Sequence, residues 1–183
     1  MEKVSARLSK LAVSATLAMT AKSRELKAQG FDVVNLSIGE PDFNTPDYVK
    51  EAAKKAIDDN ITHYPPVPGF PELRKAVSEK FKRENNLEFS PDQIVVSAGA
   101  KHSIINVFLS VLDPGDEVIV PAPYWVSYVE MIKLGEAETV VVPCSIEQDF
   151  KITPQQLEDA ITDKTRAMIF SSPSNPTGSL YSK

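Results

Sequence analysis

The spacing of apolar residues changes near residue 93 of the chain. Before it, apolar positions recur at helical spacing, and loops rich in proline and glycine separate the helical segments. After it, short β-branched runs alternate with helical segments, a pattern that indicates βαβ units. The predicted helices cover 16–28, 47–58, 71–85, 98–112, 123–133 and 153–161, and the predicted strands cover 93–97, 117–120, 139–142 and 166–171. We therefore expect an α/β fold with a mostly parallel sheet flanked by helices.

The first residues allow two interpretations. Three basic side chains precede the small, apolar segment 11–21, an order that resembles a short signal peptide. Hydroxyl side chains interrupt the apolar run, however, and no clear small-x-small cleavage site follows it. We favour a cytoplasmic N-terminal arm that leads into a helix capped by Ser14 or Thr16, with a targeting segment as the alternative.

Composition narrows the class of protein. The 183 residues are 42% hydrophobic and 25% charged, which is ordinary for a soluble globular chain. A net charge of −5 gives no electrostatic support for binding nucleic acid. No apolar run approaches the roughly 18–20 residues of a membrane span. Cys144 is the only cysteine, so an intramolecular disulfide is excluded and a reducing compartment fits best. We expect no metal site, because the two histidines lack ligand-like surroundings.

One candidate binding motif lies at residues 95–103, where a predicted strand runs through a turn of small residues into a helix. The free N–H groups of a helix's first turn form an anion site, and Gly99 and Ala100 would let a phosphate approach the backbone closely. Ser97, Lys101 or Ser103 could add side-chain contacts. A tight strand-to-helix connection without a ligand is the alternative interpretation.

Three further stretches carry groups suited to ligand contacts. Three aromatics, including Trp125, follow a predicted strand within residues 124–128 and could stack on a flat ring or pack in the core. Asn175, fixed by the proline after it, offers a donor and an acceptor, or belongs to a plain turn. In two loops, Gly39 could offer its N–H to a carboxylate and Tyr64 its hydroxyl to a phosphate, although both are also ordinary loop residues.

The order and spacing of these motifs resemble the class I, fold-type I, pyridoxal-phosphate (PLP)-dependent aminotransferases, especially the aspartate aminotransferase-like branch. The resemblance extends over nearly the whole chain. It implies an N-terminal arm and part of a small domain at 1–45, and the incomplete first part of the PLP-binding large domain at 46–183. The shared stretches are Gly-Glu-Pro-Asp-Phe at 39–43, the Tyr64 loop with Gly69, Pro-Glu-Leu-Arg at 71–74, Asp-Pro-Gly-Asp at 113–116, Pro-Tyr-Trp at 123–125 and Asn-Pro-Thr-Gly at 175–178.

The resemblance also implies a role for each motif. Residues 99–101 match the turn that binds the cofactor phosphate, and Trp125 matches the aromatic that stacks on the pyridine ring beside the substrate. Asn175 matches the asparagine near the cofactor's phenolic oxygen, which also helps to hold the substrate carboxylate. Gly39 matches the loop glycine whose N–H contacts that carboxylate. Tyr64 matches a tyrosine that crosses a dimer interface to the partner's cofactor phosphate.

In this family the lysine that forms the Schiff base lies well downstream, and so do the aspartate and arginine of the site. We therefore expect that lysine beyond residue 183, no catalytic residue within a truncated chain, and no activity of this chain alone. The implied parent is a homodimer with shared active sites that transfers an amino group from an amino acid, aspartate by branch likeness, to 2-oxoglutarate. The alternatives are a PLP lyase or synthase of the same fold, such as a carbon–sulfur lyase, and a non-catalytic aminotransferase-like partner or regulator.

Overall fold

The computed structural model describes residues 4–12, 15–36, 39 and 41–182, and the chain forms two compact units. The first, here called the sheet unit, combines Met1–Ser14 with Gly99–Lys183, and the second, the helical unit, covers Ala15–Ala98. The predicted boundary at residue 45 concerns the domains of a larger fold, and it stays a prediction.

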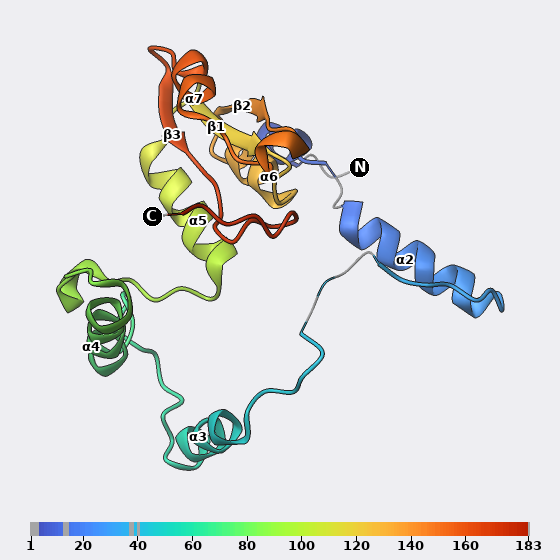
Figure 1. The fold of residues 1–183 in the computed structure, drawn as a ribbon. Helices are drawn as coiled ribbons and strands as arrows, with labels where there is room; N and C mark the ends of the chain where they lie inside the picture. Colours follow the sequence, from blue (N-terminus) through green and yellow to red (C-terminus); the bar gives the residue numbers. More distant parts are fainter. Residues whose placement is uncertain (1–3, 13–14, 37–38, 40, 183) are drawn as a thin grey trace. The chain divides into compact units, whose positions relative to one another are not determined.

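A three-stranded parallel sheet forms the centre of the sheet unit (Figure 1). Strands β1 (Glu117–Ala122), β2 (Glu138–Pro143) and β3 (Thr165–Met168) are ordered β2-β1-β3, and β1 pairs in parallel with both neighbours. Because β1 is the central strand, its residues 118–120 are at most 1% exposed. The prediction of a parallel α/β arrangement is confirmed.

Helices connect and cover these strands. Helix α5 (Ala100–Val111) precedes β1, α6 (Ser127–Leu134) connects β1 to β2, and α7 (Pro154–Ala160) connects β2 to β3. A single-turn 3₁₀ helix, η3 (Ile146–Gln148), lies between β2 and α7. Helices α5 and α6 pack together over one face of β1, and the buried cluster there comprises Phe108, Leu112, Val118, Val120, Tyr128, Met131, Ile132 and Ala137.

The N-terminal arm lies against α6. It contains a short helix that the sequence did not predict, α1 (Ala6–Ser9), whose N-cap Ser5 accepts a hydrogen bond from Leu8 N. The guanidinium of Arg7 lies 3.2 Å from a carboxylate oxygen of Glu136, which follows α6. On α6 itself, Glu130 Oε2 accepts a hydrogen bond from Ala12 N of the arm at 2.9 Å. Of the two predicted caps of the next helix, Ser14 lies outside the described residues and Thr16 lies within the helix.

The helical unit confirms three predicted helices. They are α2 (Ala15–Ala28), α3 (Asp47–Asp58) and α4 (Pro71–Lys80), the last continued by a π-helical turn, η1 (Phe81–Asn85). A 3₁₀ turn, η2 (Pro91–Gln93), follows. Few described side chains of this unit are buried, so loops rather than a core connect most of its helices. In the part of the chain that the structure describes, no helix is long and apolar enough to cross a membrane.

Three predictions about element limits are wrong. The strand predicted over 166–171 ends at Met168, and residues 169–171 belong to the loop after it. No strand forms at 93–97, because a strand requires a neighbouring strand and no described strand pairs with this run. Gln93 ends η2 instead, and Val96 N donates to Pro68 O at 2.9 Å. The helix predicted from 123 begins only at Ser127, since β1 continues to Ala122 and the next residues cross from strand to helix.

Candidate functional site

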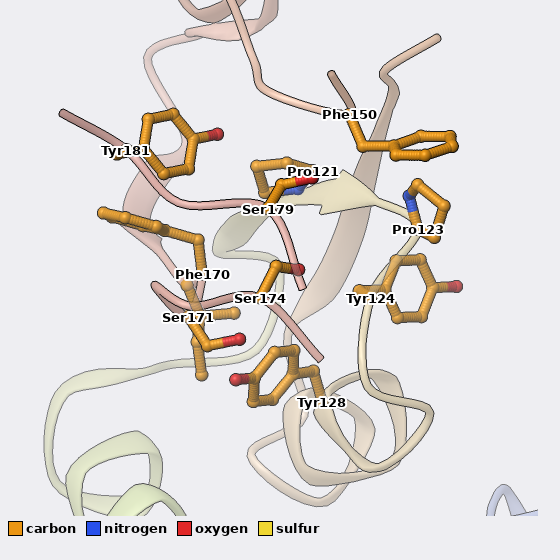
Figure 2. A pocket seen from close by; sticks show the side chains of 11 residues that line it. Pro121, Pro123, Tyr124, Tyr128, Phe150, Phe170, Ser171, Ser174, Ser179 and Tyr181 are labelled. Carbon is orange, nitrogen blue, oxygen red and sulfur yellow. The ribbon is translucent and has the colours of Figure 1, made fainter. Parts of the chain in front are cut away.

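The carboxyl ends of β1 and β3 meet at one edge of the sheet, because the two strands are parallel. Residues 123–126 follow β1 and residues 169–182 follow β3, and loops at such an edge usually carry ligand sites in α/β sheets. A narrow cleft opens between them (Figure 2). Five aromatic residues, three serines, two prolines and an isoleucine line it: Tyr124, Tyr128, Phe150, Phe170, Tyr181, Ser171, Ser174, Ser179, Pro121, Pro123 and Ile169.

Aromatic rings form much of this cleft. In Figure 2 the rings of Phe170 and Tyr181 lie on one side, and Tyr124 and Phe150 lie on the other. Phe170 and Tyr181 meet edge to face, with ring centroids 5.3 Å apart. Tyr128, on α6, is 7% exposed and belongs to the core cluster. The cleft is therefore continuous with the packed core, which fixes the strand ends that carry its loops.

The first turn of α5 has the backbone expected of an anion site. Gly99 has φ +87° and ψ 165°, a conformation nearly restricted to glycine, and a side chain built there would meet no atom within 4 Å. The amides of His102 and Ser103 donate to Gly99 O, so the amides of Ala100 and Lys101 precede the first hydrogen bonds of the helix. This open turn combines backbone donors with the positive end of the helix dipole.

The loop after β1 brings an aromatic ring to the same place. The ammonium nitrogen of Lys101 lies 4.9 Å from the centroid of the Trp125 ring. Trp125 in turn packs edge to face on Tyr128, with centroids 5.5 Å apart. Two motifs that are separate in the sequence are therefore in contact, and together they offer a cation, backbone donors and a flat aromatic ring.

Asn175 lies in the predicted turn after β3. The backbone amide of Asn175 donates to Ser171 Oγ at 3.1 Å, and Asn175 is exposed. The turn closes through hydrogen bonds from Gly178 N to Ser174 O and from Ser174 N to Ser179 O. Because Ser171 and Ser174 line the cleft, the turn that carries Asn175 lies at the same sheet edge.

The remaining predicted residues, Gly39 and Tyr64, belong to the helical unit. A side chain built on Gly39 would meet no atom within 4 Å, and Tyr64 is fully exposed. The structure thus brings Lys101 and Trp125 together in the sheet unit, and the roles of Gly39 and Tyr64 stay predictions.

Sequence reasoning missed two residues that contact the Asn175 turn, Asp149 and Tyr181. The only sequence signal for Tyr181 is an aromatic three residues after the Asn-Pro-Thr-Gly motif. Across the described ranges, no three His, Cys, Asp or Glu side chains are grouped as metal ligands would be.

Comparison with known proteins identifies the family. The family described as aminotransferase class I and II matches residues 32–183. A probable aspartate/prephenate aminotransferase of Rickettsia conorii is 52% identical over 178 residues, which cover 97% of this chain and 44% of the relative. An aspartate aminotransferase of Bacillus subtilis is 50% identical over 181 residues, covering 99% of this chain and 46% of the relative. The chain thus spans less than half the length of these relatives.

Solved structures agree. The aspartate aminotransferase of Thermus thermophilus with maleate matches with a TM-score of 0.95 and 47% identity, over all of this chain and 48% of that structure. The aspartate aminotransferase of Rhizobium meliloti matches with a TM-score of 0.96 and 43% identity, over all of this chain and 46% of that structure. The chain belongs to the class I and II aminotransferases.

Proposed function

We propose that this chain is the N-terminal part of a longer PLP-dependent aminotransferase, which transfers the amino group of an amino acid, aspartate, to 2-oxoglutarate. The observation that carries the proposal is the contact between Lys101, in the first turn of α5, and Trp125, in the loop after β1. It joins an anion site to an aromatic ring in a chain of the aminotransferase family.

The donor set at this edge fits PLP, which combines a phosphate with a flat pyridine ring. The amides of Ala100 and Lys101 and the Lys101 ammonium would hold the phosphate, because they offer N–H donors and positive charge. Trp125 would stack on the ring, since its indole lies beside the same turn. When bound, PLP supplies an electron sink for the carbon that loses or gains the amino group.

The substrate carboxylate and the partner subunit would involve three more residues. The side-chain amide of Asn175 would contact the substrate carboxylate and the phenolic oxygen of the cofactor. The backbone N–H of Gly39 would contact the same carboxylate. Gly39 suits this role because the space around it is open. Tyr64 would reach the cofactor phosphate of a second copy, and its fully exposed side chain supports a contact outside its own chain. We therefore propose a homodimer with shared active sites. We also propose a cytoplasmic location, which a single cysteine fits.

The lysine that carries the cofactor would lie beyond residue 183. The relatives are about twice as long as this chain, which leaves room for it. Without that lysine the chain lacks both the covalent link to the cofactor and a base to move the substrate proton. This chain alone is accordingly expected to show no aminotransferase activity.

The acceptor has a second candidate. Several relatives at 52–53% identity are named aspartate/prephenate or probable aspartate/prephenate aminotransferases, so prephenate is proposed beside 2-oxoglutarate. Oxaloacetate formed from aspartate by the full-length protein should be measured with 2-oxoglutarate, with prephenate and without an acceptor. The Trp125→Ala variant serves as a site control and should lose about tenfold in PLP affinity, while Trp125→Phe retains most of it.

Repeated turnover to oxaloacetate only when an acceptor is present supports transamination, because without an acceptor each site can take one amino group onto its cofactor and release a single equivalent of oxaloacetate. Continued release of a 2-oxo acid together with ammonia, without an acceptor, would support the lyase alternative instead. Failure to bind PLP would leave the non-catalytic partner or regulator as the remaining alternative.

A further inference from the structure

Two contacts attach the Asn175 turn to the segment 149–152, which precedes it by about thirty residues. The hydroxyl of Ser179 donates to Asp149 Oδ1 at 3.3 Å, and the amide of Ile152 donates to the hydroxyl of Tyr181 at 2.9 Å. Ser179 is 8% exposed, whereas the Asp149 side chain is exposed, so the buried hydroxyl joins the turn to a carboxylate at the surface. The residues of each contact are too far apart in the sequence for a local pattern to predict it. Neither contact is a backbone hydrogen bond of a helix or strand.

The turn is a closed structure, so a contact at its end reaches Asn175. Ser174 N donates to Ser179 O at 2.9 Å and Gly178 N donates to Ser174 O at 2.8 Å. Tyr181 N also donates to Ser172 Oγ at 3.1 Å. Asn175 lies within the loop that these bonds close, so they restrict the movement of its backbone.

The segment on the other side is itself fixed. Lys151 Nζ lies 2.8 Å from Asp149 Oδ2. The hydrogen bond from Lys151, followed in importance by its charge and by Ser179, holds the pKa of the exposed Asp149 carboxyl below its usual range although some loss of solvent around it opposes this. Gln148 Nε2 donates to Lys151 O at 2.6 Å, and Phe150 N donates to Ser145 O at 2.9 Å. The ring of Tyr181 is held as well, because it packs on Phe170.

We propose that Ser179 and Tyr181 are positioning residues for Asn175. Through Asp149 and Ile152 they fix the turn so that the Asn175 amide is placed for the substrate carboxylate. The proposal rests on the proposed function, since it assigns the two hydroxyl groups to the substrate site of that same reaction. Neither residue touches the substrate, and both act through Asn175.

Two single-group variants of the full-length protein test the proposal. Tyr181→Phe removes the hydroxyl and keeps the ring on Phe170, and Ser179→Ala removes the other hydroxyl. Tyr48→Phe is the matched control, because it removes the same group from an exposed tyrosine of α3. In the protein without cofactor, we expect the amides of the turn to exchange hydrogen about five- to tenfold faster in both variants, the effect of losing one hydrogen bond.

The amides of β1 should not change in the same experiment, which separates local loosening from a general loss of stability. In the protein with cofactor, KM for aspartate should rise about fivefold in each variant, with a smaller change in kcat. The Tyr48→Phe control should match the unmodified protein in both measurements.

A double-mutant cycle with Asn175→Ala decides whether the two residues act through Asn175. The rise in KM caused by Tyr181→Phe should vanish when Asn175 is already alanine. Equal rises in both backgrounds, or faster exchange without any change in KM, would overturn the positioning role. An unmodified full-length protein that does not transaminate would instead refute the proposed function. This outcome is distinct from the two that overturn the positioning role, because both of those require an active unmodified protein.

Discussion

The ammonium nitrogen of Lys101 and the ring of Trp125 are 4.9 Å apart, across the gap between the first turn of α5 and the loop after β1. They lie 24 positions apart in the sequence. The contact places a positive charge next to an aromatic surface, and it is the part of the proposed cofactor site that the sheet unit forms by itself.

This contact is measurable by fluorescence, because Trp125 is the only tryptophan of the chain. A cation beside the indole concentrates iodide, so Lys101→Met should lower the iodide quenching constant of Trp125 by roughly twofold. Quenching by neutral acrylamide should stay the same. Lys133→Met, on α6, is the control and should leave both constants unchanged, whereas equal iodide quenching with and without Lys101 would contradict the contact.

Gly99 is expected to resist substitution for a reason that involves its backbone alone. At φ +87° and ψ 165° a side chain is strained even though no atom lies within 4 Å of its position. Gly99→Ala should therefore cost about 1–3 kcal/mol in the free energy of unfolding, measured with urea. Gly39→Ala is the control, because Gly39 has equally open surroundings without the positive φ. Similar losses for both would show that the conformation of Gly99 is not the cause.

The contact between the N-terminal arm and α6 should weaken in acid. Ala12 N donates to Glu130 Oε2 at 2.9 Å, and Glu130 also accepts from Lys133 Nζ at 2.9 Å. The Lys133 bond above all, with a smaller contribution from Ala12, holds the pKa of Glu130 below its usual value of 4.5, against the effect of burial. Because the pKa is lowered in the folded chain, the ionised carboxylate stabilises the fold fully at pH values above the ordinary pKa of glutamate. This stabilisation is lost as pH falls through the lowered pKa.

The amide signal of Ala12 should accordingly shift between neutral pH and about pH 3, with its midpoint below the ordinary pKa of glutamate. Glu130→Gln keeps an oxygen that accepts from Ala12 and removes the titrating group, so the shift should disappear in this variant. A shift of the same size in Glu130→Gln would assign the titration to another group.

The thiol of Cys144 should be unreactive in the folded chain. Cys144 is 6% exposed, and burial raises the pKa of its thiol, so little thiolate is present or accessible at neutral pH. Its reaction with a disulfide reagent should be roughly a hundredfold slower in buffer than in concentrated urea. Equal rates would mean that the edge of the sheet around β2 opens freely.

Helices and strands whose limits depend on residues adjacent in the sequence were predicted correctly. Helix α3 matches its prediction at both ends, because Pro46 and the run of helix-forming residues after it are neighbours in the sequence. Strands β1 and β2 were predicted from β-branched runs bounded by turn residues, and their parallel pairing follows from the helix between them.

Contacts between distant residues were beyond the reach of such patterns. The run at 93–97 has the composition of a strand, but a strand is defined by its neighbour, and none pairs with it in the described chain. For the same reason nothing in the sequence connects Tyr181 with Ile152, which are 29 residues apart. Trp125 was assigned to a cofactor by resemblance, and its proximity to Lys101 came only from the fold.

Borohydride reduction of the full-length protein isolated with its cofactor, followed by peptide mapping, would locate the lysine that carries PLP. The proposal that the cofactor lysine lies beyond residue 183 predicts one pyridoxyl group for each chain, attached to a lysine in that region, and no PLP retained by the 183-residue chain after free PLP has been removed. A full-length protein that retains no PLP, or a label on a lysine within the first 183 residues, would contradict it.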